Sequence, residues 1–149
     1  MRAVIQRVNY AQVSVSGTVI GKIQEGYVVL LGVTHEDTRE DAFYLADKIS
    51  KLRIFEDIHG KMNQSIQDVK GSILVVSQFT LYGACKKGNR PSFSKAAIPK
   101  QAEILYEYFI NQLSKRNILV QSGRFGADMQ VTLCNNGPVT IWMDSKQME

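Results

Sequence analysis

Hydrophobic and polar positions alternate along much of the chain, with the period of two that is typical of β-strands buried on one face. Residues 11–15 (Ala-Gln-Val-Ser-Val) alternate most strictly. Similar short stretches predict strands at residues 2–8, 19–23, 53–55 and 118–120. Residues 27–33 are apolar throughout, which predicts a strand buried on both faces. The longest stretch, residues 72–81, predicts a single extended strand.

Two segments instead have the period of an amphipathic helix. Thr38 lies three residues before Asp41, which predicts a capping box with Asp41 in place of the usual Glu or Gln. The apolar residues behind it recur at helical spacing, at Ala42, Leu45, Ala46, Ile49 and Leu52. A second helix is predicted from Pro99, a residue favoured in a first helical turn, to residues 115–117. Its apolar face consists of Ala102, Leu105, Tyr106, Phe109 and Leu113.

The end of the chain predicts two short strands, residues 129–134 and 139–143, joined by Asn-Asn-Gly-Pro. This is strong turn chemistry, and its ordinary interpretation is a hairpin turn. A proline in this position donates no N–H to a sheet, so the carbonyls of Gly137 and Pro138 are free to bind something else. In sum, residues 1–149 predict a single α+β domain with a mostly antiparallel, strongly curved sheet covered by two main helices.

Composition narrows the functional class. No apolar run approaches the roughly 20 residues of a membrane-spanning helix, and the strand-like start does not resemble a signal peptide. Cys85 and Cys134 form no Cys-x-x-Cys motif, which favours a reducing, cytoplasmic location. The net charge of +4 and the pI near 9.1 are compatible with a polyanionic partner such as RNA.

The usual catalytic motifs are missing from the sequence. His35 and His59 lie in polar turn regions, and neither has neighbours at metal-ligand spacing, so no metal or other cofactor is expected. Neither a nucleophile elbow nor a phosphate-binding loop occurs. Cys85 lies in a basic loop but has no evident histidine partner. An enzyme with this sequence has to work without a conventional general base.

Two groups of polar residues remain open to more than one interpretation. Ser77, Gln78 and Thr80 interrupt a hydrophobic stretch, where they either satisfy each other inside the sheet or orient a bound ester on the floor of a pocket. A basic loop follows directly. It is either simply solvated or holds phosphates close to the reacting group, through Lys86, Lys87 and Arg90.

Over essentially its full length, the chain resembles the D-aminoacyl-tRNA deacylases. Two signature motifs carry the resemblance, Ser-Gln-Phe-Thr-Leu at residues 77–81 and Asn-Asn-Gly-Pro-Val-Thr at residues 135–140. Both match in their defining positions, in order and at the right separation. Further matches lie at residues 5–8, 30–33, 53–57, 60–63, 90–93 and 123–129.

The resemblance implies hydrolysis of the ester between a D-amino acid and tRNA, as quality control in translation, and activity on glycine mischarged onto tRNA. It also implies a barrel-like fold and a homodimer in which Gly137 and Pro138 of one subunit enter the pocket of the other. Their peptide bond is expected to be cis, with both carbonyls towards the substrate's α-amino group. Because this turn occupies the direction of an L side chain, L-aminoacyl-tRNA is rejected by a clash. The other substrate-binding residues implied are Phe79, Phe125 and Met129.

The catalytic residues implied are Ser77, Gln78 and Thr80, with Thr80 viewed as a nucleophile in the family. A threonine hydroxyl without a base is weak, so we favour activation of water by the 2′-hydroxyl of the substrate ribose. Backbone N–H groups around Phe79 and Thr80 would then stabilise the oxyanion. Two hypotheses from other classes remain: a non-catalytic RNA-binding module, and a hydrolase of small esters.

Overall fold

The computed structural model describes residues 1–147. Its main sheet has six strands, in the order β2-β1-β3-β6-β7, with β8 paired to the other edge of β1. These strands are β1 (Arg2–Val15), β2 (Thr18–Ile23), β3 (Gly26–Gly32), β6 (Ser72–Ser77), β7 (Leu119–Ser122) and β8 (Gln130–Asp144). A small separate sheet consists of β4 (Phe55–Glu56) and β5 (Met62–Gln64). The helices are α1 (Arg39–Lys51), the 3-10 helix η1 (Phe79–Tyr82) and α2 (Pro99–Ser114).

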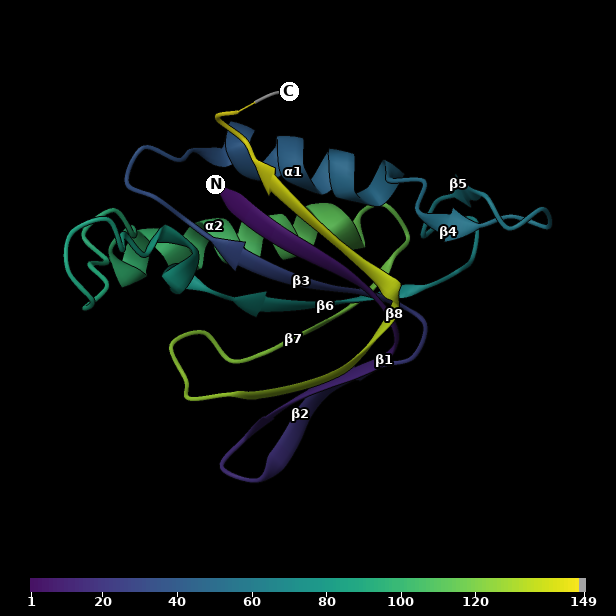
Figure 1. Cartoon of the computed structure of the whole chain (residues 1–149), viewed down its shortest axis with the longest axis horizontal. Helices are drawn as coiled ribbons and strands as arrows, with labels where there is room; N and C mark the ends of the chain where they lie inside the picture. The colour runs from purple at the N-terminus through teal and green to yellow at the C-terminus, as the bar shows by residue number, and fades with distance from the viewer. Residues whose placement is uncertain (148–149) are drawn as a thin grey trace.

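The sheet curves strongly, and both α-helices lie on one side of it (Figure 1). Apolar residues of α1 and α2 pack on one face of β1, β3 and β6 to form the larger hydrophobic core. A smaller core, which includes Val13 of β1 and Leu74 of β6, lies where β1 and β2 curve back over the opposite face. The predicted α+β fold, with a barrel-like sheet covered by two helices, is confirmed.

The strand β1 is the centre of the sheet and pairs antiparallel with β2, β3 and β8. The predicted strands at residues 2–8 and 11–15 are therefore one strand, which changes partner from β3 to β2 along its length. The pairs β3–β6 and β6–β7 are parallel. Parallel neighbours need long crossover connections, and α1 and α2 lie in these two connections.

The predicted hairpin at the end of the chain is wrong. β8 runs in one direction from Gln130 to Asp144 and pairs with β1 on both sides of the Gly-Pro sequence. Gln6 pairs with Thr140 and Val8 with Asn135, so one residue of β1 faces four residues of β8. Residues 136–139 form an irregular bulge, where the missing N–H of the proline costs no ladder hydrogen bond.

The predicted strand at residues 72–81 is too long, because β6 ends at Ser77. The neighbouring strand β3 ends at Gly32. The last hydrogen bond between the two strands therefore runs from the Gln78 N–H to the Leu31 carbonyl, at 2.8 Å, and residues beyond Gln78 have no β3 residue to pair with. The chain then turns into η1, and the Tyr82 ring is buried. Phe79 and Thr80 consequently lie on a short helix and not on the two faces of a strand.

Both predicted α-helices are present, and their predicted apolar faces are buried, except that Leu52, just after α1, is partly buried. The capping box of α1 is confirmed, because the Thr38 N–H donates to Asp41 Oδ2 at 2.9 Å. The short strand predicted at residues 53–55 is displaced to Phe55–Glu56. No helix within residues 1–147 is long and apolar enough to cross a membrane.

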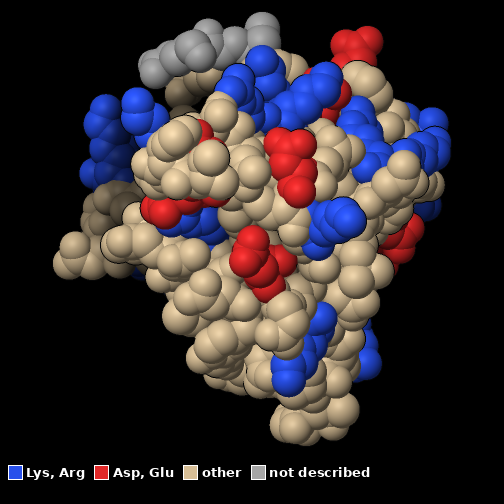
Figure 2. All heavy atoms as spheres, turned by 90° about the vertical axis from the view of Figure 1, so that its right-hand side faces the viewer, with Lys and Arg blue, Asp and Glu red and all other residues tan. Residues whose placement is uncertain are grey.

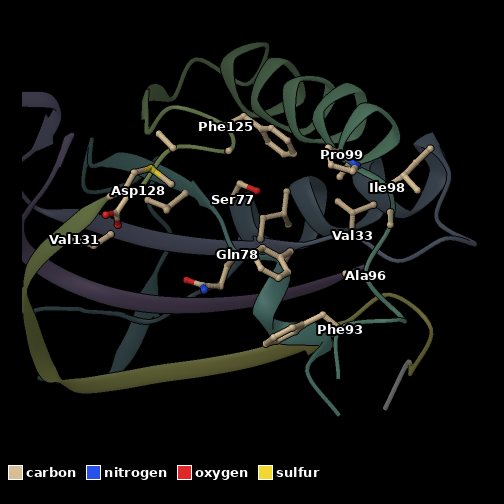
Figure 3. Close-up of a pocket in the computed structure, with 18 residues that line it drawn as sticks. Val33, Ser77, Gln78, Phe93, Ala96, Ile98, Pro99, Phe125, Asp128 and Val131 are labelled. Carbon is tan, nitrogen blue, oxygen red and sulfur yellow. The ribbon is translucent and has the colours of Figure 1, made fainter. Parts of the chain in front are cut away.

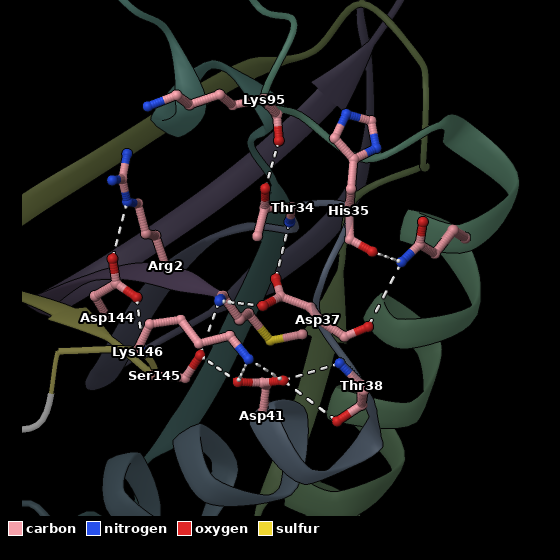
Figure 4. A network of polar contacts seen from close by, with 12 residues as sticks. Arg2, Thr34, His35, Asp37, Thr38, Asp41, Lys95, Asp144, Ser145 and Lys146 are labelled. Atoms are coloured by element: carbon pink, nitrogen blue, oxygen red, sulfur yellow. Dashed lines mark hydrogen bonds and ion pairs between the residues drawn. The ribbon is translucent and has the colours of Figure 1, made fainter.

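A buried polar network joins the start of β1, the start of α1 and the end of β8 (Figure 4). The α-amino group of Met1 donates to Asp37 Oδ1 at 2.6 Å and to Ser145 Oγ at 2.8 Å. Ser145 Oγ in turn donates to Asp41 Oδ1 at 2.7 Å. Burial opposes ionisation of Asp41, but hydrogen bonds from Ser145, Thr38 and Lys146 outweigh it and lower the pKa to about 2.

Candidate active site

A largely apolar cavity of about 610 Å³ lies between the end of β6, the start of α2 and the loop that precedes β8 (Figure 3). The strand β6 contributes Val76 and Ser77, and the two following residues, Gln78 and Phe79, continue the wall. On one side the cavity floor is held by strand pairing, because Val76 and Ser77 pair with Leu30 and Leu31 of β3. A cavity of this size and character, with a few polar groups, is typical of small-molecule and cofactor sites.

The structure brings together five of the residues that the sequence analysis assigned to the site. Two distant segments of the chain contribute them, and all five line the cavity: Ser77, Gln78, Phe79, Phe125 and Met129. Phe125 is positioned by Tyr106 of α2, whose ring centroid lies 5.7 Å from that of Phe125. Tyr106 is itself fixed, because its hydroxyl donates to the Val75 carbonyl at 3.1 Å. Burial raises the pKa of Tyr106 to about 12, so the hydroxyl remains a donor at neutral pH.

Thr80 lies beside the cavity and does not line it. Its hydroxyl oxygen accepts a hydrogen bond from the Gln78 side-chain amide, so the two polar residues are coupled. The N–H groups of Phe79 and Thr80 are the first two of η1, where a helix has no internal acceptors. Within residues 1–147, neither N–H donates a hydrogen bond, which leaves both available to a bound molecule.

Gly137 and Pro138 lie on the exposed bulge of β8 and do not line the cavity of their own chain. Their peptide bond is cis, as predicted. The bulge rests on the buried Arg7, whose Nε donates to the Asn136 carbonyl at 3.2 Å and whose Nη1 donates to the Ile54 carbonyl at 2.6 Å. The Asn135 side chain closes the bulge by accepting the Val139 N–H at 3.2 Å.

Comparison with known proteins identifies the family of the chain. Residues 4–144 match the family model described as D-Tyr-tRNA(Tyr) deacylase. The chain belongs to this family. It is 62% identical over 147 residues to the D-aminoacyl-tRNA deacylase of Bacillus pumilus, covering 99% of this chain and 100% of the relative.

Two solved structures also resemble this member of the deacylase family. One is a c-Myc DNA unwinding element binding protein, with a TM-score of 0.91 and 46% identity, covering 97% of this chain and 98% of the other. The other is a probable eukaryotic D-amino acid tRNA deacylase, with a TM-score of 0.83. Its coverage is 95% of this chain and 97% of that chain, but at 18% identity it supports the fold alone.

The basic residues predicted to bind RNA lie outside the cavity. Lys86, Lys87 and Arg90 are exposed on a loop closed by paired backbone hydrogen bonds between Ala84 and Ser92. This loop connects η1 with Phe93; Phe79 at the start of η1 and Phe93 line the cavity, but residues 80–92 do not. The end of the molecule shown in Figure 2 also carries many Lys and Arg side chains, but Asp and Glu lie among them and the face is not uniformly basic.

A third wall of the cavity was not predicted from the sequence. Phe93 packs edge-to-face on Phe79, with ring centroids 5.1 Å apart, and the adjoining wall consists of Ala96, Ala97, Ile98 and Pro99. This loop is tied to the end of β3, because the Ala97 N–H donates to the Val33 carbonyl at 2.9 Å. In the sequence, only the family match at residues 90–93 pointed to this wall, because apolar residues in a loop follow no periodic pattern.

Two further side chains of the site were also missed. Asp128 contributes an exposed carboxylate to the cavity. Arg7 lies in a strand that the sequence analysis recognised, but its burial under the bulge of β8 depends on how β1 and β8 pair. Within the described part of the chain, no group of three or more His, Cys, Asp or Glu side chains is placed to hold a metal ion.

Proposed function

We propose that residues 1–149 form one D-aminoacyl-tRNA deacylase domain, which hydrolyses the ester of D-aminoacyl-tRNA to free tRNA and a D-amino acid. The observation that carries the proposal is that Ser77, Gln78 and Phe79, from the first signature motif, share one cavity with Phe125 and Met129. The name of the Bacillus pumilus relative supports the same activity. The enzyme acts in the cytoplasm as part of translation quality control.

The active species is a homodimer in which the bulge of one subunit enters the cavity of the other. Supporting this, Gly137 and Pro138 are exposed and lie outside the cavity of their own chain. A second copy related by a two-fold axis supplies the bulge to both cavities at once. The carbonyls of Gly137 and Pro138 then accept hydrogen bonds from the substrate's α-ammonium group.

Chiral selection follows from this arrangement. Once the α-ammonium group and the ester are held, D and L substrates differ only in the direction of the side chain. The bulge occupies the L direction and excludes L-aminoacyl-tRNA by contact, while a D side chain points away from it. Glycine has no side chain to exclude, so glycyl-tRNA mischarged on tRNA(Ala) is also a substrate.

Hydrolysis proceeds with help from the substrate. The 2′-hydroxyl of the terminal ribose orients and activates the attacking water, and the free N–H groups of Phe79 and Thr80 stabilise the developing oxyanion. Gln78 holds the Thr80 hydroxyl in place, and Ser77 supports the floor of the cavity. A glutamine amide cannot accept a proton from Thr80, which favours an orienting role for Thr80 over a nucleophilic one.

A deacylation assay with one D-aminoacyl-tRNA, its L counterpart and the corresponding free ester tests the function. D-selective hydrolysis that requires tRNA is expected. Binding of aminoacyl-tRNA without turnover would instead indicate a non-catalytic RNA-binding module, and turnover of the free ester alone would indicate a hydrolase of small esters.

A mixing experiment tests the assembly. Gly137→Ala alters the bulge and leaves the cavity residues in place, whereas Gln78→Ala alters the cavity and leaves the bulge in place. Each homodimer is therefore impaired at both of its sites. In a mixed dimer, the intact bulge of one subunit meets the intact cavity of the other. Statistical exchange restores about a quarter of the wild-type activity. No recovery after confirmed subunit exchange, or a fully active monomer in sedimentation, would refute the dimeric site.

A further inference from the structure

Arg2 connects the 3-10 helix beside the cavity to two strands of the sheet. It is the first residue of β1, where its backbone lies between Gly32 of β3 and Asp144 of β8. The side chain spans two elements: Nε donates to Asp144 Oδ2 at 3.1 Å, and Nη1 donates to the Leu81 carbonyl of η1 at 2.9 Å. Figure 4 shows the contact with Asp144.

Two aromatic rings complete the surroundings of the guanidinium. Its central carbon lies 4.5 Å from the ring centroid of Tyr82 and 5.9 Å from that of Trp142. Trp142 pairs with Val4 in β8, so it lies diagonal to Arg2 across the two strands. Two hydrogen bonds and two ring contacts therefore fix the plane of the guanidinium. A lysine ammonium cannot reproduce this set, because it lacks the planar fork.

The helix η1 needs such an external contact. Its four residues are too few to be stable alone, since a short helix forms few internal hydrogen bonds for the backbone order it requires. Leu81 belongs to its last turn, where carbonyls have no partner within the helix. The Tyr82 hydroxyl is buried without a hydrogen-bond partner in the described part of the chain. Among the described residues, Arg2 therefore provides the polar attachment of this end of η1 to β1 and β8.

We propose that Arg2 is a positioning residue for the deacylation reaction: through the Leu81 carbonyl and the Tyr82 ring, it holds η1 so that the N–H groups of Phe79 and Thr80 face the reacting ester. This inference rests on the proposed function. Arg2 does not line the cavity and does not touch the reacting atoms. Arg2 therefore affects the reaction only through the orientation of the Phe79 and Thr80 N–H groups. This orientation matters most in the transition state, where the oxyanion develops.

The test is Arg2→Met, which keeps a long apolar side chain but removes the guanidinium. Displacement of η1 is expected to lower kcat on D-aminoacyl-tRNA by about 10- to 100-fold. KM is expected to stay nearly unchanged, because the contacts that bind tRNA are elsewhere. Arg2→Lys, which retains the charge and one hydrogen bond, is expected to have an intermediate kcat.

Arg39→Met is the matched control. Arg39 also lies over a tyrosine ring, with its guanidinium carbon 5.3 Å from the Tyr108 centroid, but it begins α1 and does not line the cavity. Its removal is expected to leave kcat unchanged. A kcat for Arg2→Met equal to that of Arg39→Met would overturn the proposal. If Arg2→Met fails to fold, a wild-type kcat for Arg2→Lys overturns it and an intermediate kcat supports it.

Hydrogen exchange gives a second measurement that does not depend on activity. The N–H groups of Leu81 and Gly83 donate within the η1 turn, to the carbonyls of Gln78 and Thr80, at 3.2 and 2.9 Å. Both are expected to exchange faster in Arg2→Met than in Arg39→Met, and equal exchange rates would contradict the proposal. If the wild-type protein lacks D-selective turnover, the proposed function fails, but exchange at these two positions still decides whether Arg2 holds η1.

Discussion

Replacing Gly137 by alanine is expected to destabilise the protein and to impair hydrolysis together. Gly137 has φ +123°, in a region that L-residues rarely adopt. An added Cβ would lie 2.9 Å from Arg7 Nη2 and 2.9 Å from Val139 Cγ2, both closer than normal contacts. The backbone conformation alone costs about 1–3 kcal/mol in a residue with a Cβ.

The contact with Arg7 adds to this cost, because Arg7 is buried and cannot swing into solvent. If it shifts, its hydrogen bonds to the carbonyls of Ile54 and Asn136 lengthen, and a bond from a charged donor contributes about 1.5–3 kcal/mol. We expect a total loss of about 2–5 kcal/mol in the free energy of unfolding. The Asn136 contact supports the bulge directly, so hydrolysis of D-aminoacyl-tRNA is expected to fall as well.

Guanidinium chloride unfolding and single-turnover hydrolysis of D-aminoacyl-tRNA measure the two effects. Gly60→Ala is the control, because Gly60 also has a positive φ, +74°, but nothing lies within 4 Å of the added Cβ. Its backbone strain alone is expected to cost about 1–2 kcal/mol, with full activity. If Gly137→Ala were as stable and as active as Gly60→Ala, the crowding against Arg7 would have no consequence, and this prediction would be wrong.

Three further outcomes are expected. The depressed pKa of Asp41 contributes about 1–2 kcal/mol to the free energy of unfolding above about pH 4, and this contribution is lost as the pH falls to about 2. Unfolding measured as a function of pH should show the loss in the wild type and not in Asp41→Asn. Thr80→Ala should lose about 1–3 kcal/mol of transition-state stabilisation in single-turnover assays, because the hydroxyl only orients the substrate. A drop to the uncatalysed rate would instead identify Thr80 as a nucleophile. A triple alanine variant of the basic loop should raise KM for D-aminoacyl-tRNA and weaken its dependence on salt, with kcat retained, if tRNA phosphates bind Lys86, Lys87 and Arg90.

The amino-acid sequence alone predicted those elements whose evidence is local. Helical spacing and the pairing of Thr38 with Asp41 predicted α1, and Pro99 marked the start of α2. The continuous apolar run at residues 27–33 predicted a strand buried on both faces, which is β3. The signature residues Ser77 to Phe79 were identified as candidates because their motif is contiguous. Each of these patterns depends on residues a few positions apart, so it can be recognised without knowledge of the fold.

Features that depend on a distant partner could not be predicted from the sequence and follow from the three-dimensional packing of the chain. Residues 129–143 have the chemistry of a hairpin, but β1 is long enough to pair with both halves, so the chain continues in one direction and the Gly-Pro sequence becomes a bulge. Residues 78–81 alternate like a strand, but β3 ends at Gly32 and provides no further ladder. The pairing of β1 with β8 thus produces the Gly-Pro bulge, and the end of β3 allows the chain after β6 to turn into η1. In both cases a strand forms only where a second strand supplies its hydrogen bonds.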